Sequence, residues 1–548
     1  MEISEETSAL AKGTIWQNIG SIGIKLVSFF YTILIARLVS QDEVGLFYFG
    51  ISLAGIVGIL ADFGISQTVQ RYVPFYLGKG DKVSARRIIH LSIVLGSLLM
   101  LLAAAVFFLA APDISAFFSN PGLLPLLAIL AVYLLINQAF NIAKSVLASL
   151  QMMKERSVGD NVQNVLKVLL TLALIFTMGP SAAALTWAFL LSFAAALFYL
   201  FWALYRALKK VQLLPPAPGH DWYLPLLRET LPFGLTMVSI LMFTVLLTYT
   251  DRVMLGYLLQ TDANAQIAIY ALATSLATMI PTMAGSVVGI LLPVASGLAG
   301  RAEMERINKA AQTSLRWVIF SSVPLAAFLA AFAAPSLTVL YGASYEPGAL
   351  SLMLFCLGLF LYLLGTVQST LIAAHRLVKL ELTAFAAGAL ANIALNWVLV
   401  PPFGISGSAF ASMVSLALIA LINHFYATRE FGFRFPPTLW RHLLSAALLF
   451  AFLFGLEQVS YPYLIHLPIP ISDGSLLLGT LDKVVKAAVL GVFFGIGGLA
   501  YLLLLNLLRL FEHEDRHVFE KIVSKMGVPA KWRGHLSALV FWSLPKAA

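Results

Sequence analysis

Charge is scarce in this sequence: Asp, Glu, Lys and Arg together make up only 11% of its 548 residues. Soluble domains carry about 25% charged residues, which keep a folded surface in contact with water. Here 60% of the residues are hydrophobic and the mean hydropathy is +0.89. This balance excludes an ordinary soluble domain and indicates a protein that crosses a membrane many times.

Cysteine is nearly absent as well, and the single Cys356 excludes an internal disulfide and any metal cluster built from cysteines. Cys356 lies in an apolar run, where we expect it to serve packing. The sequence has no GxxxxGKS/T phosphate-binding loop and no HExxH zinc motif. We therefore expect no ATP-binding cassette, no cofactor and no nucleic-acid partner, with a coupling ion, H⁺ or Na⁺, left open.

Long apolar runs, by contrast, fill most of the chain. A run of about 20 residues crosses the ~30 Å hydrocarbon core of a bilayer as a helix. The first twelve residues lack the basic start and cleavage site of a removable signal peptide, so we expect the first helix to stay in the membrane. Fourteen runs lie near 14–39, 45–70, 88–111, 123–150, 159–178, 182–205, 231–258, 265–297, 309–333, 349–374, 381–401, 405–427, 441–457 and 484–510.

Basic residues cluster in alternate connections, as at Lys79 and Lys82, Lys154 and Arg156, and in the tail. The connections between these clusters are almost free of lysine and arginine. Because positive residues stay on the cytoplasmic side, both termini are expected in the cytoplasm and the protein in the cell membrane. An even number of helices follows from this arrangement.

An internal repeat relates the two halves of the chain. The stretch at 45–54 matches 268–277 at an offset of 223 residues, and Lys154 matches Lys379 at an offset of 225. A parallel repeat of six helices implies two lobes, with two additional helices at the C-terminal end. The predicted parts are an N-lobe over 1–205, a cytoplasmic linker over 206–230, a C-lobe over 231–427, helices thirteen and fourteen over 441–510, and a cytoplasmic amphipathic tail over 511–548.

Two details of this plan concern prolines and the tail. Pro281 and Pro293 fall inside the eighth run, so that helix is expected to kink or break. The tail places Val518, Phe519 and Val523 at helical spacing between charges. It is predicted either to lie in the membrane interface or to pack on the cytoplasmic ends of the bundle.

Polar side chains recur on single faces of several predicted helices. Such a stripe is costly against lipid and must face protein or water. The first helix carries Asn18, Ser21, Lys25, Ser28 and Thr32 on one face. The other stripes are Gly55, Gly58, Asp62 and Ser66; Asn137, Asn141 and Lys144; Asp160, Asn164, Lys167 and Thr171; Thr244, Thr248 and Asp251; and Asn392 and Asn396.

Each stripe also has a structural interpretation. Asn392 and Asn396 can simply join helices by hydrogen bonds, and Lys144 and Lys167 can extend to the interface. Lys25 either lines a hydrated cavity or forms a structural ion pair with Asp62. Asp251 and Arg252 point about 100° apart on a helix and need not pair.

The opening residues carry a resemblance to a known family. Ala36-Arg37-Leu38, Gly45-Leu46-Phe47, Asp62-Phe63-Gly64-Ile65, Arg71-Tyr72 and Gly80-Asp81 resemble the start of polysaccharide-biosynthesis flippases of the multidrug/oligosaccharidyl-lipid/polysaccharide exporter superfamily. The resemblance is strongest over residues 10–90. It implies a flippase that moves a polyprenyl- or dolichyl-phosphate-linked oligosaccharide to the outer leaflet for surface polysaccharide or glycoprotein synthesis.

The resemblance also implies where the substrate binds and which partners the protein has. Helices one, two, seven and eight would line a central cavity, and helices thirteen and fourteen a groove for the lipid tail. Glycosyltransferases of the same pathway are expected partners, and the protein is expected to be a monomer. The candidate cavity residues are Lys25, Asn18, Ser21, Arg37, Asp62, Asp251, Arg252 and Asn141.

Two other functions stay open from the sequence. A multidrug antiporter of the same superfamily needs an acidic cavity for its cations, whereas the first helix offers Lys25. A membrane enzyme acting on lipid-linked sugars is expected to present carboxylates in a substantial outer loop. The first outer loop offers only Asp42 and Glu43.

Overall fold

The computed structural model describes residues 20, 21, 23–214, 223–259, 262–299, 301, 303–375, 377–465, 476–525, 529, 532, 534, 535, 537 and 540–543. Over these residues the chain is helical and has no strand, which confirms the all-α class. Twelve segments are long and apolar enough to cross a membrane. One of them, 379–431, contains two predicted spans, and the helical residues 23–38 supply the first. These agree with about fourteen membrane helices.

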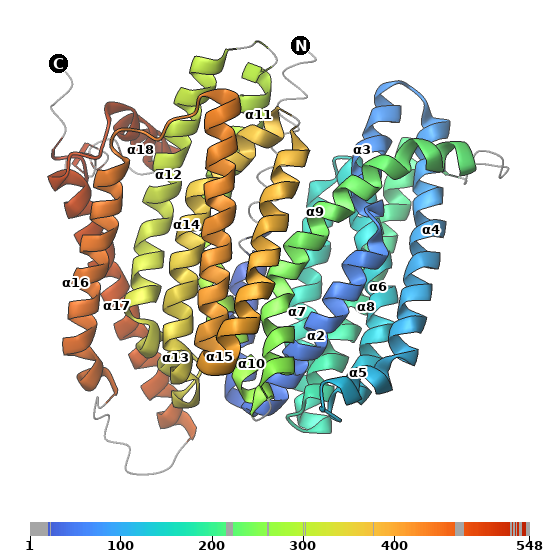
Figure 1. The fold of residues 1–548 in the computed structure, drawn as a ribbon, viewed down its shortest axis with the longest axis horizontal. Helices are drawn as coiled ribbons and strands as arrows, with labels where there is room; N and C mark the ends of the chain where they lie inside the picture. The colour runs from blue at the N-terminus through green and yellow to red at the C-terminus, as the bar shows by residue number, and fades with distance from the viewer. Residues whose placement is uncertain are drawn as a thin grey trace. The chain divides into compact units, whose positions relative to one another are not determined.

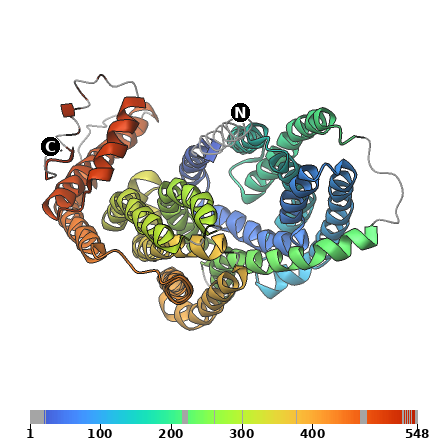
Figure 2. The same cartoon turned by 90° about the horizontal axis from the view of Figure 1, so that it is seen from above.

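The chain forms two compact units, of which unit 1 comprises Met1–Leu276 and Leu382–Ser415. Within unit 1, α4, α6 and α8 lie side by side, α7 packs on α8, and α9 packs along α2 (Figures 1 and 2). Its helices are α2 (Gln41–Asp62), α3 (Ile65–Gly78), α4 (Lys82–Leu109), α5 (Ala111–Phe117), α6 (Leu123–Ser149), α7 (Met153–Met178), α8 (Ala182–Val211), α9 (Tyr223–Leu258) and nearly all of α10 (Ala263–Ala277).

Unit 2 comprises Ala277–Glu381 and Leu416–Ala548. In this unit α12 packs against α11, α14 and α16, and α16 packs against α17. Its elements are α11 (Met279–Ala299), α12 (Met304–Ala331), α13 (Ala333–Leu340), the 3₁₀-helix η1 (Ala343–Gly348), α14 (Ala349–Ala374), α16 (Leu439–Ile465), α17 (Leu476–Leu507) and α18 (His513–Lys525).

The helix α15 (Val378–Phe431) contributes to both units and joins the two spans expected over 381–401 and 405–427. The join is at Gly404, whose backbone (φ 54, ψ −134) is not helical. Pro401 and Pro402 precede it and remove two backbone donors from the ladder. The predicted boundary between the two spans is therefore present as a local break.

The internal repeat is visible in the order and spacing of the helices. The elements α4, α5, α6 and α7 begin at residues 82, 111, 123 and 153, and α12, α13, α14 and α15 begin at 304, 333, 349 and 378. Corresponding starts thus differ by 222 to 226 residues, which is close to the offset found in the sequence. Even the short helices α5 and α13 occupy matching places.

The compact units do not coincide with the predicted lobes over 1–205 and 231–427. The segment Leu382–Ser415 belongs with Met1–Leu276, because part of α15 packs within unit 1. The linker expected over 206–230 is helical at both ends, since α8 continues to Val211 and α9 begins at Tyr223. The lobe boundaries themselves stay a prediction.

The eighth run is interrupted, as its prolines predicted, but at only one place. The helix α10 ends at Ala277 and α11 begins at Met279. Pro281 lacks the N–H that would bond to the carbonyl of Ala277, which accounts for a break at this point. The backbone of α11 continues in helical form through Pro293, so the second proline does not end the helix.

The tail helix α18 packs on α12 of unit 2, as in the second of its two predicted placements, and its location on the cytoplasmic side stays a prediction. Asp515 of α18 accepts two hydrogen bonds from Arg316 of α12, at 2.7 and 2.9 Å, and both side chains are buried. Phe519 contacts the ring of Phe541, and Val523 is buried. A buried ion pair of this kind holds a helix in one register against its neighbour.

Candidate functional site

The second membrane helix is broken in its middle, and the break positions Asp62. The helix α2 ends at Asp62, Phe63 and Gly64 both have left-handed backbone (φ 51 and 72), and α3 begins at Ile65. A Cβ on Gly64 would lie 2.3 Å from the carbonyl oxygen of Gly234 in α9. Glycine is therefore required here both by its backbone angles and by the close approach of α9.

The carboxylate of Asp62 is buried, with 7% of the residue exposed. It accepts hydrogen bonds from the Ser66 hydroxyl at 2.9 Å, from Gln138 Nε2 at 3.1 Å and from the Ser66 backbone N–H at 3.4 Å. The last of these donors belongs to the first turn of α3, where the helix dipole favours a negative charge. Asp62 thus links the two halves of the broken helix and also ties them to α6.

A polar cavity of about 320 Å³ opens beside Asp62, and we call it the Asp62 pocket. Five helices of unit 1 contribute to it, namely α2, α3, α6, α7 and α9. Its lining is Ala54, Gly55, Gly58, Ile59, Asp62, Ser66, Gln67, Gln70, Tyr133, Asn137, Gln138, Asn141, Lys144, Ser145, Arg156, Val245 and Tyr249. Two predicted stripes, one on the second helix and one on the fourth, therefore converge on one cavity.

The charged groups of the Asp62 pocket include one basic side chain that no neighbouring carboxylate neutralises. Lys144 forms an ion pair with Asp160 of α7, at 2.5 Å, and so does not simply extend to the interface. Arg156 is half-buried, and its guanidinium has no hydrogen bond or ion pair within the described part of the chain. Gln67 Oε1 is buried without a hydrogen-bond partner. The lining thus holds one carboxylate against two cations, and several amides remain able to bind a ligand.

Asp251 lies in a second, separate cluster of buried polar groups in unit 1. One of its carboxylate oxygens accepts from Asn392 at 3.0 Å and from Asn396 at 2.9 Å. The other accepts from the Ser412 hydroxyl at 2.5 Å and from the Tyr270 hydroxyl. Four neutral donors from α10 and α15 therefore surround one carboxylate of α9.

This cluster contains oxygen atoms of the kinds that bind small cations, although Asn392 and Asn396 direct their amide N–H groups toward Asp251. Asp251 is 3% exposed, and no cationic side chain is paired with it in the described residues. Asn392 Oδ1 is buried without a hydrogen-bond partner. Carboxylate, amide and hydroxyl oxygens are ligands that hard cations prefer. Asn392 and Asn396, for which the sequence also allowed a structural role, join α15 to α9 through their hydrogen bonds to Asp251.

The remaining predicted residues of the first helix lie outside both groups. Lys25 is half-buried, makes no ion pair with Asp62 and does not line the Asp62 pocket. Ser21 is exposed and Arg37 is half-buried on the same helix. Asn18 lies outside the described residues. Their roles in binding stay predictions.

Two further cations have aromatic neighbours. The Arg252 guanidinium lies 5.4 Å from the ring centre of Tyr48, and it does not pair with the adjacent Asp251. Lys167 is 9% exposed, donates to Asn164 Oδ1 at 3.2 Å and lies 4.4 Å from the ring centre of Tyr31. Lys167 is therefore held inside the bundle. The structural interpretation, in which its side chain extends to the membrane interface, does not apply.

Some residues of the Asp62 pocket were missed by reasoning from the sequence. Arg156 was assigned to a cytoplasmic connection, and Gln67, Gln70 and Gln138 were not singled out. The signal for Arg156 was its place at the start of a polar helix face that continues to Asp160. Gln138 is adjacent to Asn137, so a periodicity of 3.6 residues places it off the stripe.

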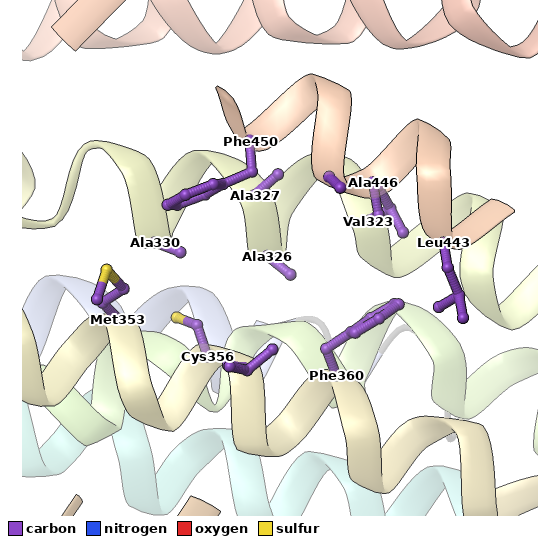
Figure 3. Close-up of a pocket in the computed structure, with 12 residues that line it drawn as sticks. Val323, Ala326, Ala327, Ala330, Met353, Cys356, Phe360, Leu443, Ala446 and Phe450 are labelled. Carbon is purple, nitrogen blue, oxygen red and sulfur yellow. The ribbon is translucent and has the colours of Figure 1, made fainter. Parts of the chain in front are cut away.

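Unit 2 contains an apolar cavity of about 390 Å³ between α12, α14 and α16. Met353, Cys356 and Phe360 of α14 point toward alanines of α12 and toward Leu443 and Phe450 of α16 (Figure 3). Cys356 is 1% exposed, so it serves packing as expected. The small alanine side chains leave room for a hydrocarbon chain between the three helices.

Comparison with known proteins identifies the class of the fold. The lipid II flippase MurJ, in an inward closed conformation, is 16% identical, with a TM-score of 0.64 over 88% of this chain and 98% of that chain. An inward-facing multidrug resistance MATE family transporter of the MOP superfamily is 15% identical, with a TM-score of 0.60 over 75% and 94%. The fold is therefore that of MOP-superfamily membrane transporters and flippases.

The family follows from the sequence match. The chain belongs to the polysaccharide biosynthesis protein family, whose family model matches residues 10–299. This confirms the resemblance predicted from the opening residues. An uncharacterized membrane protein of Methanocaldococcus jannaschii is 20% identical over 440 residues, which are 78% of this chain and 86% of that protein.

Proposed function

We propose that this protein is a flippase that moves a lipid-linked oligosaccharide from the cytoplasmic to the outer leaflet by opening alternately to each side. The carrier is a polyprenyl or dolichyl phosphate or pyrophosphate, and the glycan is used for surface polysaccharide or glycoprotein. The observation that carries this proposal is the Asp62 pocket, a polar cavity with more basic than acidic side chains between apolar helices. Membership of the polysaccharide biosynthesis family supports it.

The Asp62 pocket is suited to the headgroup of such a lipid. Moving a phosphate out of water is costly unless a positive group meets it. Arg156 has no partner within the described chain and can bind phosphate oxygens in a bidentate manner, with Lys144 nearby as a second charge. The amides of Asn137 and Asn141 can donate to and accept from sugar hydroxyls. Lys25, Arg37 and Arg252 contact the phosphate later along its path.

The lipid tail stays in contact with apolar surface throughout. The resemblance implied a groove between helices thirteen and fourteen. The apolar cavity between α12, α14 and α16 offers a second place for a hydrocarbon chain. Because isoprenoid chains interact with protein only through packing and the hydrophobic effect, a lining of alanine, leucine and phenylalanine is suitable for them.

Transport is coupled to a cation, H⁺ or Na⁺, at Asp251. The carboxylate and the side-chain oxygens of Asn392, Asn396 and Ser412 can surround a small cation once the amides turn their oxygens inward. A proton on Asp251 is the alternative occupant, because the Tyr270 and Ser412 hydroxyls can then accept as well as donate. Either ion neutralises a charge buried among neutral groups.

The basic connections support an orientation with both termini in the cytoplasm of a cell membrane. The Asp62 pocket then lies toward the cytoplasmic side, since Asp62 is the last of the 22 residues of α2. The protein acts as a monomer beside glycosyltransferases of its pathway. A cysteine replacing the exposed Asp113, in a Cys356→Ser background, is expected to react with impermeant reagents only from outside. Labelling from the cytoplasm alone contradicts this orientation.

The multidrug antiporter is the second candidate function. Its cationic substrates require an acidic cavity, whereas the Asp62 pocket has one carboxylate and two cations. The membrane enzyme is disfavoured because the named structural relatives are transporters and flippases. An assay for glycosyl transfer without leaflet exchange separates the enzyme from the flippase.

The experiment that tests the flippase is leaflet exchange in proteoliposomes, with a fluorescent polyprenyl-pyrophosphate oligosaccharide as substrate. Arg156→Ala is expected to reduce the exchange rate about 10- to 100-fold, since a hydrogen bond to a charged group contributes ~1.5–3 kcal/mol. Arg156→Lys is expected to keep part of the rate, because a point charge still attracts phosphate. Lys154→Ala, on the exposed start of the same helix, is the matched control.

Two results contradict the proposal. The first is exchange by the natural protein no faster than in empty liposomes. The second is equal exchange by the Arg156→Ala and Lys154→Ala variants, which removes the headgroup role of the pocket. Efflux of an organic cation in the same liposomes, lost in Asp62→Asn, supports the antiporter instead.

A further inference from the structure

A second polar cavity of unit 1 lies at the end opposite the Asp62 pocket. It has a volume of about 530 Å³ and is formed where α2 begins, α5 and α9 end and α10 begins. These connections carry almost no lysine or arginine, so they belong to the predicted outer face. Its lining is Asp42, Phe117, Phe118, Ser119, Asn120, Gly256, Tyr257, Leu259, Asp262, Ala263 and Asn264. We call it the loop-end pocket.

The polar groups of the loop-end pocket are free to bind a ligand. Asp42 and Asp262 are exposed, and neither carboxylate has an ion pair or side-chain hydrogen bond in the described residues. Asn120 Nδ2 donates to Asn264 Oδ1 at 2.8 Å. This bond orients both amides and leaves the Asn264 side-chain N–H groups and the side-chain oxygen Oδ1 of Asn120 for a ligand. The lining therefore offers donors and acceptors but no positive charge.

Aromatic rings stand beside these polar groups. Phe117 and Tyr257 stack with ring centres 5.0 Å apart and planes inclined by 11°, and both belong to the lining. Trp397 also stacks with Tyr257, with ring centres 6.0 Å apart. All three rings are exposed, at 63%, 41% and 56%. Three adjoining rings thus present an apolar surface next to carboxylates and amides.

The pocket is also held in shape by close backbone contacts. A Cβ on Gly45 would lie 1.7 Å from the carbonyl oxygen of Asn264, so α2 and the start of α10 touch directly. A Cβ on Gly256 would lie 2.3 Å from the ring of Phe49, which in turn packs on Phe118. A site fixed before binding loses less entropy when a ligand arrives.

This combination matches the chemistry of sugars. A pyranose ring has an apolar face of C–H groups, which packs on aromatic rings, and a rim of hydroxyls, which bind carboxylates and amides. The two carboxylates and the lack of basic side chains oppose phosphates, anionic lipid headgroups and uronic acids. The volume falls in the range of sites for small ligands.

We propose that the loop-end pocket binds neutral or amino sugar residues of the transported glycan on the outer side, an inference that rests on the proposed flippase function. The Asp62 pocket accepts the headgroup at the cytoplasmic side, and the loop-end pocket receives the sugars as the protein opens outward. The stacked rings bind the sugar faces. Asp42 and Asp262 select against acidic sugars.

The test measures saccharide binding to the full-length protein in nanodiscs by isothermal titration calorimetry. The probes are maltotriose, N,N′-diacetylchitobiose, digalacturonate and oligosaccharides released by mild acid from the lipid-linked pool of the native membranes. Binding by the released, neutral or N-acetylated probes is expected, and digalacturonate is expected to bind about tenfold more weakly. Tyr257→Ala and Phe117→Ala are each expected to weaken binding about tenfold. Asp262→Asn is expected to reduce the discrimination against digalacturonate.

Two matched variants serve as controls. Phe198→Ala removes an exposed ring of α8 away from the pocket, and Asp113→Asn removes an exposed carboxylate near it that is not part of the lining. Both are expected to bind like the natural protein. Failure of every probe to bind overturns the proposal. An equal loss of saccharide binding in Tyr257→Ala and Phe198→Ala also overturns the proposal, because it assigns the aromatic rings to the membrane interface.

Leaflet exchange of the lipid-linked oligosaccharide, measured on the same preparations, separates this proposal from the proposed function. Exchange by a protein that binds no saccharide overturns the loop-end site and leaves the flippase standing. Saccharide binding that Tyr257→Ala abolishes, in a protein without exchange, supports the site and contradicts the flippase.

Discussion

The hydroxyl of Ser66 donates a hydrogen bond of 2.9 Å to the carboxylate of Asp62 across the break between α2 and α3. The two residues are four positions apart, the spacing of neighbours on one helix face, although the backbone between them is left-handed. Asp62 is thus the last residue of α2, and its carboxylate also accepts from the backbone N–H of Ser66 in the first turn of α3. Broken membrane helices of this kind place polar backbone ends beside a cavity, where a ligand can reach them.

The first prediction concerns the glycine at this break. Gly64→Ala is expected to lower stability by at least ~1–2 kcal/mol, because an alanine in left-handed conformation is strained and its Cβ would lie 2.3 Å from the Gly234 carbonyl oxygen. Gly78→Ala, at a position with nothing within 4 Å of the added Cβ, is the control. The measurement is the thermal unfolding midpoint in detergent. Equal midpoints for the two variants would show that the break is not required.

The polar faces could be predicted from the sequence because they follow helical periodicity. Gly55, Gly58, Asp62 and Ser66 were assigned to one face, and all four line the Asp62 pocket. Asn137, Asn141 and Lys144 were assigned to another face, and they line the same pocket. A burial cost of several kcal/mol for polar groups in lipid makes such patterns reliable signs of a cavity or an interface.

What periodicity does not give is which faces meet. Asp251 and Asn396 are 145 positions apart, and only the folded chain brings the amide within 2.9 Å of the carboxylate. Lys144 and its partner Asp160 likewise come from two different predicted stripes, whose pairing periodicity does not reveal. The break at Phe63-Gly64 was also absent from the expected run over 45–70, because helices tolerate a single glycine and only the approach of α9 decides the outcome.

The second prediction tests the role of Lys25. Lys25→Ala is expected to abolish leaflet exchange, because it removes a positive charge from the proposed path of the headgroup. The unfolding midpoint is expected to stay unchanged, because Lys25 has no ion pair with Asp62. Lys25→Arg is expected to retain part of the exchange, since it keeps the positive charge. Normal exchange in Lys25→Ala would end its assignment to the headgroup path. A loss of ~3–5 kcal/mol that Lys25→Ala/Asp62→Asn restores would instead indicate a structural pair.

The third prediction tests ion coupling at Asp251. Asp251→Asn removes the only charge of its cluster while keeping the shape of the side chain. Exchange is expected to lose its dependence on an imposed Na⁺ or pH gradient, because the amide carries no negative charge to balance a cation and does not titrate. Ser415→Ala is the control, since that hydroxyl bonds only to the Ala411 carbonyl of its own helix. The same gradient dependence in both variants would place coupling elsewhere.

The last prediction concerns the tail helix and the pair Arg316 and Asp515. Both side chains are almost completely buried, with 4% and 1% of each residue exposed. Arg316→Ala leaves the buried carboxylate of Asp515 without its cation and is expected to cost ~3–5 kcal/mol. Asp515→Ala is expected to cost less, because Glu512 still forms an ion pair with Arg316. The double variant is expected to cost less than the sum of the two, and the difference is the coupling between α12 and α18.

An exposed ion pair at the start of α12 provides the control for this cycle. Arg306 and Glu303 are 2.7 Å apart, and the arginine side chain is 73% exposed. Surface pairs contribute only ~0–1 kcal/mol because water screens them, so Arg306→Ala is expected to leave the unfolding midpoint nearly unchanged. If Arg316→Ala lowers the free energy of unfolding no more than Arg306→Ala does, the tail helix contributes nothing to the stability of unit 2. If only the buried pair is costly, α18 is part of the folded unit, and truncation before Glu512 would leave Arg316 without a partner.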